Sequence, residues 1–285
     1  MYKALNYWVF GGFGPNRTPY EFIDFAVEME LDGVELTVGD AISPDISEAE
    51  CVKIRDYAKS KGIGLRTLAT GFYWGCSLSS EDAAERATAM DFTRKYLQLA
   101  AWLGVETVLL VPGATCVGWD DSRPIQSYAS VWQKSVVAIK EISILAEKLG
   151  VNVGLENVWN QFLLSPMEWK LYLEQFESER IGIYFDVGNC CYIGRPQDYV
   201  EILGDKIKAV HLKNFSGSDC AGGMHGFGDD LMTGDVDFTA VFAALNQIGY
   251  RGPLTAEMIP FSRLPDLVLP DQELAEKTAR QLKAL

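Results

Sequence analysis

Four short apolar runs in the second half of the sequence each lead into a side chain that can bind a metal or carry a proton. The runs are VGLE, IYFD, KAVH and LTAE, which end in Glu156, Asp186, His211 and Glu257. Three carboxylates and one imidazole are ligands that suit a divalent ion such as Mn²⁺, Co²⁺, Mg²⁺ or Zn²⁺. The four residues therefore predict a site for one divalent metal ion.

Each of the four residues has a simpler explanation when it is taken alone. A single glutamate after a strand is commonly a solvated loop residue, and a single histidine in an apolar run is commonly a hydrogen-bonded core residue. Four such residues at four strand ends are harder to explain in this way, because an unpaired buried carboxylate costs free energy. A cation between them would remove that cost, and this favours the metal site.

The elements that must position these residues follow one repeated pattern. An amphipathic stretch ends in Gly, and a short apolar run rich in β-branched residues follows it. A Gly just past a helix end supplies the left-handed residue that turns the chain into the next strand. The pattern appears in six segments, MELDGVELTV, KSKGIGLRTLAT, AWLGVETVLLVPG, EKLGVNVGLENV, LGDKIKAVHLKNF and NQIGYRGPLTAEM. Two further apolar runs, KALNYWVF and RIGIYFDVG, complete a count of eight predicted strands.

Helical patterns separate the predicted strands. They cover Pro19–Glu30, Glu48–Lys61, Glu81–Leu103, Ser130–Leu149, Ser165–Phe176 and Phe238–Ile248. Apolar strands that alternate with helices indicate parallel strands covered by helices, and eight such units favour a closed barrel over an open sheet. No linker divides the chain, so we predict one (β/α)8 TIM-barrel domain over residues 1–285. The longest irregular region, Ser216–Asp235, contains six glycines, and a loop of that length is typically functional or mobile.

A barrel of this kind places the four titratable residues together. Active sites of these barrels form at the carboxyl ends of the strands, and strands five to eight lie side by side around one rim. Glu156, Asp186, His211 and Glu257 end those four strands. The metal site and the active site are therefore expected at the same place.

Composition and charge exclude several classes of protein. The 285 residues carry a formal net charge of −14 and show no cluster of Lys or Arg, which argues against nucleic-acid binding. No run approaches the roughly 18 apolar residues of a membrane span, and the start MYKALNYWVFGG does not have the pattern of a signal peptide. Six cysteines without metal-type spacing favour reduced thiols. We therefore expect a cytoplasmic protein without nucleic-acid or membrane partners.

The segments around the four residues resemble a known superfamily. They read LEN at 155–157, FDVGN at 185–189, VHLK at 210–213 and TAEM at 255–258, accompanied by FLLSP at 162–166 and GDVDF at 234–238. This set is similar to the xylose-isomerase-like sugar and sugar-phosphate isomerases and epimerases. Within them it most resembles the L-ribulose/L-xylulose-5-phosphate 3-epimerase and D-tagatose/D-psicose 3-epimerase groups. The resemblance implies that Glu156, Asp186, His211 and Glu257 bind one divalent metal, usually Mn²⁺.

The implied reaction agrees with elementary chemistry. A proton next to a ketone is weakly acidic, so its removal needs a base together with stabilisation of the enediolate by the metal. Two carboxylates on opposite sides of the sugar could exchange the proton, one removing it and the other returning it. Glu156 and Glu257, from strands five and eight, are the expected catalytic pair, and either could take either role.

Four further residues are candidates for substrate binding. Tyr7 lies near the end of strand one and Glu35 is expected to close strand two, where Glu35 could also support a metal ligand. Asn189 follows the strand-six aspartate at a position where free-ketose 3-epimerases carry His, and in this it resembles the phosphorylated-ketose group. Lys213 could contact a phosphate or a sugar oxygen, or it could be an ordinary surface lysine. Free-ketose enzymes also carry an acidic residue where this chain reads WNQF at 159–162.

A ketose or ketose-phosphate 3-epimerase is the function that the sequence favours, with a small sugar or sugar phosphate as its ligand. An aldose–ketose isomerase and an inosose-type dehydratase remain open, because they share the metal and the proton abstraction. A non-catalytic sugar-binding barrel would not require both glutamates. A DNA-repair enzyme of the endonuclease IV type would need more histidines than His211 and His225. Association into a homo-oligomer remains open.

Overall fold

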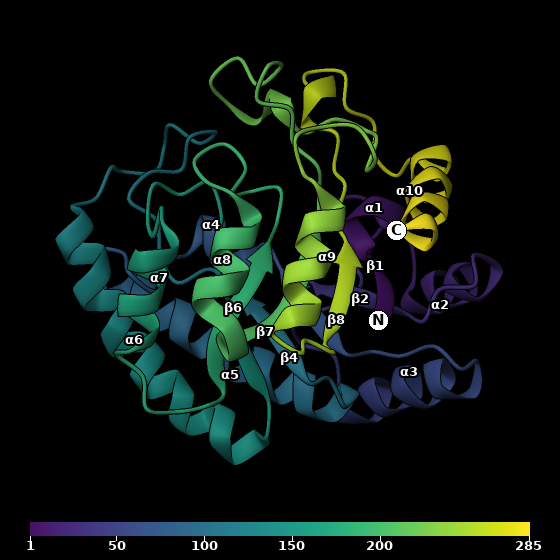
Figure 1. Cartoon of the computed structure of the whole chain (residues 1–285). Coiled ribbons are helices and arrows are strands. Elements are labelled where there is room, and N and C mark those ends of the chain that lie inside the picture. Colours follow the sequence, from purple (N-terminus) through teal and green to yellow (C-terminus); the bar gives the residue numbers. More distant parts are fainter.

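The computed structural model describes all residues, 1–285, as a closed parallel barrel whose eight strands follow one another in sequence order, with β1 pairing to β8. Figure 1 shows helices around the strands, as the sequence predicts. The strands are β1 Tyr2–Asn6, β2 Gly33–Val38, β3 Thr67–Thr70, β4 Thr107–Leu110, β5 Asn152–Glu156, β6 Ile181–Asp186, β7 Ile207–Leu212 and β8 Pro253–Ala256. The predicted single TIM barrel is confirmed.

Six helices lie where the helical patterns predict them, with ends that differ by a few residues at most. These are α2 Pro19–Glu28, α3 Glu48–Ser60, α5 Ala83–Leu103, α6 Tyr128–Leu149, α7 Pro166–Leu173 and α9 Phe238–Gln247. The remaining helices, which the sequence analysis does not predict, are α1 Tyr7–Gly11, α4 Phe72–Gly75, α8 Pro196–Leu203 and α10 Gln272–Ala284. The 3₁₀ turns are η1 Gly204–Lys206, η2 Met224–Gly226 and η3 Phe261–Arg263.

Local signals fix several helix ends. The α5 and α6 helices both end at glycines in the left-handed conformation, Gly104 at φ 74° and Gly150 at φ 70°. Their backbone N–H groups donate to the last turn of each helix, and glycine adopts this conformation without a Cβ clash. The α2 and α7 helices begin with capping boxes, in which Thr18 pairs with Glu21 and Ser165 pairs with Glu168.

One expected strand is shorter than predicted. KALNYWVF does not continue as a strand, because β1 ends at Asn6 and Tyr7–Gly11 forms the short helix α1. The Asn6 side chain accepts a hydrogen bond from the Trp8 backbone N–H at 2.7 Å and so caps this helix. The run of apolar residues after Asn6 is therefore buried as a helix turn rather than as a strand.

The loops after β7 and β8 lie together above the carboxyl ends of the strands (Figure 1). The predicted irregular region Ser216–Asp235 contains only η2, and Ser262 of η3 donates its backbone N–H to the carbonyl of Phe227 at 2.8 Å. Phe215, Cys220 and Phe227 form a small apolar core beneath this loop, separate from the main core. The loop is therefore packed over the strand ends.

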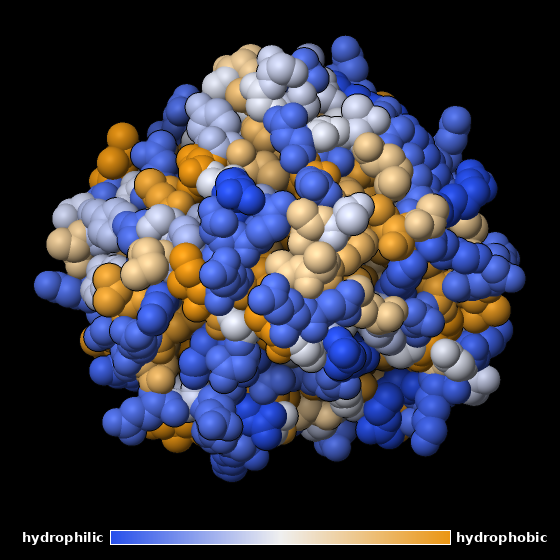
Figure 2. Space-filling model, in the orientation of Figure 1, coloured by the Kyte–Doolittle hydropathy of each residue, from blue (hydrophilic) through white to orange (hydrophobic).

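The outer surface is that of an ordinary globular protein. On the face seen in Figure 2, hydrophilic residues predominate and hydrophobic ones are scattered among them. No helix is both long enough and apolar enough to cross a membrane.

Candidate metal centre and active site

The strand register places two of the four predicted ligands directly opposite each other. Asp186, the last residue of β6, lies opposite His211 of β7, and His211 lies opposite Thr255 of β8. Ile183 pairs with Ile207 and Tyr184 with Ala209, so Lys208 is left as an extra residue in β7. Such a bulge shifts the residues beyond it by one position, and here it aligns His211 with Asp186.

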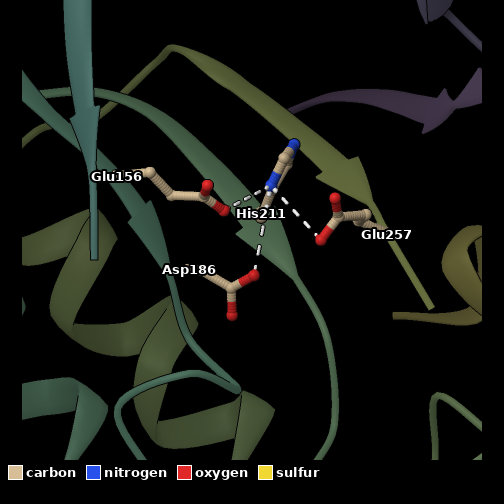
Figure 3. A group of neighbouring side chains, drawn as sticks. All are labelled: Glu156, Asp186, His211 and Glu257. Carbon is tan, nitrogen blue, oxygen red and sulfur yellow. Dashed lines mark ion pairs between the residues drawn. The ribbon is translucent and has the colours of Figure 1, made fainter. Parts of the chain in front are cut away.

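The four side chains converge on one point. Figure 3 shows the three carboxylates arranged around the same ring nitrogen of His211. The distances from His211 Nδ1 are 3.5 Å to Glu156 Oε1, 3.7 Å to Glu257 Oε2 and 4.0 Å to Asp186 Oδ2. One ligand atom from each residue lies within 4.8 Å of all the others. This is the arrangement of a site for a single divalent cation.

Two atoms of the cluster lack a hydrogen-bond partner. Asp186 Oδ2 and His211 Nδ1 are both buried without one, although Lys213 Nζ lies 3.1 Å from Asp186 Oδ2. The other oxygen, Asp186 Oδ1, accepts from the Asn189 backbone N–H at 2.8 Å, which fixes the carboxylate. A buried polar atom without a partner is costly. A metal ion would satisfy both atoms, so the residues fit the predicted cation.

The opposite side of the His211 ring is held by Glu35. Glu35 Oε1 lies 2.7 Å from His211 Nε2 and 2.7 Å from Asn6 Nδ2, and Glu35 Oε2 accepts from the Tyr184 hydroxyl. Burial opposes the charge, yet His211, Tyr184 and Asn6 together lower the pKa of Glu35. An ionised Glu35 places a proton on Nε2 and leaves Nδ1 directed at the three carboxylates, as metal-binding histidines require.

Lys213 lies beside the cluster. Its Nζ is 2.5 Å from Glu257 Oε2 and 3.1 Å from Asp186 Oδ2, and the residue is only 5% exposed. Burial works against its charge, but Asp186, Glu257 and Glu156 together raise the pKa of Lys213. Lys213 is therefore a buried ammonium group at the edge of the site rather than a surface lysine.

Burial also changes the acidity of Glu156. Loss of water, reinforced by the nearby carboxylates of Glu257 and Asp186, raises the pKa of Glu156 to about 7. A carboxyl group that can both hold and release a proton near neutral pH is suited to proton transfer.

Two members of the cluster, Glu156 and Glu257, line the inner end of a cavity of about 640 Å³. Glu156, Glu257, Lys213 and Asn189 are the polar residues at this inner end, and most of the other lining residues are apolar. The cavity volume lies within the range typical of small-molecule sites, which is roughly 300–1,000 Å³.

Of the four predicted substrate contacts, two line the cavity and two do not. Asn189 and Lys213 lie in its wall. Tyr7 is fully buried and donates its hydroxyl to the carbonyl of Arg17 at 2.7 Å, away from the cavity. Glu35 lies inside β2 rather than at its end, so its side chain points into the barrel interior beneath His211. Neither Tyr7 nor Glu35 therefore lies where its side chain could contact a molecule in the cavity.

Sequence reasoning missed several residues of the wall. Trp8, one position after Tyr7, lines the cavity, and so do Phe13 and Trp119 from loops without a recognised motif. The only signal in the sequence was the presence of aromatic residues beyond predicted strand ends. Phe72 and Trp74, which follow β3, are also in the wall, whereas Tyr73 between them is buried.

Comparison with known proteins agrees with this fold and site. The profile of the family described as xylose isomerase-like TIM barrel matches residues 23–285. The chain belongs to this family. The resemblance seen in the sequence is thereby confirmed.

The names of two relatives of this chain state a reaction class. The chain is 27% identical to a putative L-ribulose-5-phosphate 3-epimerase of Escherichia coli K12, over 69% of this chain and 67% of that protein. It is also 27% identical to a ketose 3-epimerase of Arthrobacter globiformis, over 84% of this chain and 78% of that protein. These family relatives are sugar epimerases, which agrees with the expectation of a sugar epimerase or isomerase enzyme.

Solved structures agree in fold. A D-psicose 3-epimerase crystallised in the presence of D-fructose superposes with a TM-score of 0.80 at 21% identity, over 100% of this chain and 97% of that one. The IOLI protein, whose crystal structure holds a zinc atom, superposes with a TM-score of 0.76 at 17% identity, over 100% and 97% of the two chains. At these identities the similarity establishes the barrel fold of the family.

Proposed function

We propose that the protein is a divalent-metal-dependent 3-epimerase that acts on a ketose or a substituted ketose. The names of the two relatives support the reaction class, since both are ketose or ketose-phosphate 3-epimerases. The buried cluster of three carboxylates and one imidazole supports the requirement for a metal.

The position of Glu156 relative to Glu257 is the observation that carries the proposal. Both carboxylates line the cavity, and they lie on different sides of the His211 ring in Figure 3. They extend from β5 and from the residue after β8, so a sugar bound between them would present one face to each. A binding protein needs no such pair, whereas inversion of a carbon centre needs one proton carrier on each face.

The proton transfer can be written with the residues of the chain alone. One glutamate, as the carboxylate, takes the C3 proton, and the electrons of the C–H bond move into the neighbouring carbonyl to form an enediolate. The other glutamate, as the carboxylic acid, then returns a proton to C3 from the opposite face. When bound, a divalent metal would stabilise the negative charge that develops on the oxygens.

Lys213 and Glu156 fit this scheme. The buried Lys213 ammonium can donate a hydrogen bond to a sugar oxygen at the inner end of the cavity, where it would help to offset the same negative charge. The pKa of Glu156, raised to about 7 by burial and by its acidic neighbours, allows it to exist in either protonation state near neutral pH.

Mn²⁺ is the metal that we propose, with Zn²⁺, Co²⁺ and Mg²⁺ as alternatives. Carboxylates dominate the cluster and favour a hard ion, while the single imidazole also accepts a borderline ion.

The test is exchange of the C3 proton. The purified protein would be loaded with Mn²⁺ and incubated in D₂O with a set of ketoses, and NMR would follow deuterium at C3 together with the ratio of epimers. We expect deuterium to enter C3 as the epimer forms, and chelation to stop both. Incorporation of deuterium at C1 with formation of an aldose would instead identify an isomerase.

A further inference from the structure

The outer part of the cavity differs in character from its floor. Six aromatic residues of the wall come from five separate connections between strands and helices, and these are Trp8, Phe13, Trp74, Trp119, Trp159 and Phe227. The Phe227 ring lies 5.1 Å from Lys213 Nζ, so the apolar wall begins directly beside the candidate active site. One continuous cavity therefore joins the metal-binding floor to an aromatic outer chamber.

The cavity is larger than an unsubstituted sugar requires. If each of the roughly twelve non-hydrogen atoms of a hexose filled the ~30 Å³ of a water molecule in the liquid, the hexose would occupy ~360 Å³. The cavity measures about 640 Å³, so an unsubstituted hexose would leave part of it unfilled.

The aromatic residues at the mouth are unusually exposed. Phe13 is 53% exposed and Trp119 is 48% exposed, and the Trp119 ring stacks edge-on against Trp74 at 4.6 Å between centroids. Exposed aromatic side chains at the mouth of a cavity are typical of a ligand-binding surface, because a ligand that covers them removes apolar area from water and so lowers the free energy.

A phosphate group has no binding site in this chamber. Lys213 is the only cationic residue in the cavity wall, and Asp186 and Glu257 already pair with it. The outer wall carries a negative charge instead, because Asp40 lies there and accepts from Trp8 Nε1 at 2.7 Å and from Gly14 N–H at 2.6 Å. A phosphate placed in this chamber would face a carboxylate rather than a cation.

The glycine-rich loop offers no substitute. The hydroxyl groups of Ser216 and Ser218 donate to Asp219, at 2.7 and 3.1 Å, and the Gly217 backbone N–H donates to Asp235 at 2.7 Å. Carboxylates of the chain thus already accept hydrogen bonds from these three donors of the loop. The residues that this loop contributes to the cavity are Met224 and Phe227, which are apolar.

We propose that the substrate is a keto sugar that carries, in place of a phosphate, an uncharged substituent with an apolar face, bound in the aromatic outer chamber. An aryl or alkyl group and a second sugar ring share this chemistry, because the C–H face of a sugar also packs against aromatic rings. The proposal rests on the 3-epimerase function for the inner end of the cavity. It distinguishes the substrate from the phosphate ester named for the Escherichia coli relative.

Calorimetric binding to the Mn²⁺-loaded protein tests the proposal without turnover. Four ligands would share one ketose: unsubstituted, or with a phosphate, a phenyl group or a second sugar at the end remote from the carbonyl. We expect the phenyl or the disaccharide ligand to bind with a Kd at least tenfold below that of the phosphate. The tighter of the two identifies the kind of substituent. A phosphate that binds as tightly as both of them would overturn the proposal.

Two variants test whether the substituent binds in the aromatic outer chamber. Trp119→Ala should raise the Kd of the preferred substituted ligand at least fivefold, and should raise that of the unsubstituted ketose by less. Ile125→Ala is the control, because Ile125 lies in the same connection between β4 and α6, is 83% exposed and does not line the cavity. Equal binding of the preferred ligand to the Trp119→Ala variant and the parent would contradict the outer chamber.

The same ligands separate this proposal from the 3-epimerase function when C3 exchange is measured in D₂O. Tight binding of a substituted ligand without any exchange would overturn the function and support the chamber. Exchange together with preferred binding of the phosphate would support the function and overturn the chamber.

Discussion

His211 Nε2 and Glu35 Oε1 lie 2.7 Å apart, and both side chains are fully buried inside the barrel. The pair joins β2 to β7 across the barrel interior, and Glu35 also accepts from Asn6 and Tyr184. This contact sets the orientation of the imidazole before any metal binds. Glu35 therefore helps to orient the His211 nitrogen that faces the three carboxylates.

Glu35→Gln should weaken metal binding without changing the four ligands. The amide can no longer accept strongly from His211 Nε2–H, and loss of such a contact typically costs 10- to 100-fold in metal affinity. Titration of the metal-free variant with Zn²⁺ by calorimetry would measure this. A direct contact with the sugar would instead raise KM and leave the metal Kd as in the parent, and that result would contradict the role inferred here.

The barrel and the cluster of four side chains could be predicted from the sequence for identifiable reasons. Glycines such as Gly104 and Gly150 end helices with a conformation that other residues rarely adopt, so they mark the helix-to-strand turns. In β5 and β6 several apolar residues come directly before the final carboxylate, so a charged residue there stands out. Glu156 and Asp186 were found in this way, and the barrel then brings both side chains close to His211.

The sequence left open whether Glu35 contacts the substrate or supports a metal ligand, and it did not indicate that Tyr7 points away from the cavity. Glu35 lies in the middle of β2, and its partner His211 is 176 residues away in the sequence. Only the closed barrel shows that these two inward side chains meet. Tyr7 begins a helix rather than ending a strand, and that turn directs its ring away from the cavity. The helix α10 was missed although Asp271 caps it and its apolar residues recur with helical spacing.

Metal affinity should depend on pH in two stages. Burial and the acidic neighbours raise the pKa of Glu156 to about 7, so its carboxyl group holds a proton below that pH and is ionised above it. Burial opposes protonation of His211, but Glu35, Glu257 and Glu156 raise its pKa well above the usual value. A metal must displace both protons at acidic pH and only the imidazole proton at higher pH.

Calorimetry in buffers of different ionisation enthalpy measures this proton release. We expect about two protons per metal bound near pH 6 and about one near pH 8, with affinity falling as the pH drops through 7. Release that stays constant between these pH values would show that Glu156 does not hold a proton in the metal-free protein.

Metal should stabilise the native barrel, and Asp186→Asn should remove most of that effect. A ligand at 100 times its Kd adds about 2.7 kcal/mol to the free energy of unfolding, because it binds only the folded state. The parent should therefore show a Tm several degrees higher with saturating Zn²⁺ than after chelation. Asp205→Asn, an exposed aspartate outside the cluster, should keep the full shift. A full shift in the Asp186→Asn variant would mean that the metal binds elsewhere.

Glu156→Gln and Glu257→Gln should each slow turnover, and they should differ in which proton transfer they block. Each amide keeps the shape of the side chain and loses the ability to carry the proton. Amide oxygens are also poorer metal ligands than carboxylates, so metal occupancy must be restored with excess Mn²⁺ before rates are compared. With metal bound, we expect turnover to fall by a factor of roughly 10² or more, the usual scale of general acid–base catalysis.

The distinguishing measurement is solvent exchange with each epimer separately. Glu156 and Glu257 lie on different sides of His211, so each should serve one face of C3. For a given epimer, one variant should take up no deuterium, because its base is missing. The other should still remove the proton and return deuterium to the same face, which gives exchange without inversion. Starting from the opposite epimer, the two variants should exchange these behaviours. If both variants turned over at the parent rate with metal bound, the two-carboxylate mechanism would be wrong and the cluster would serve binding alone.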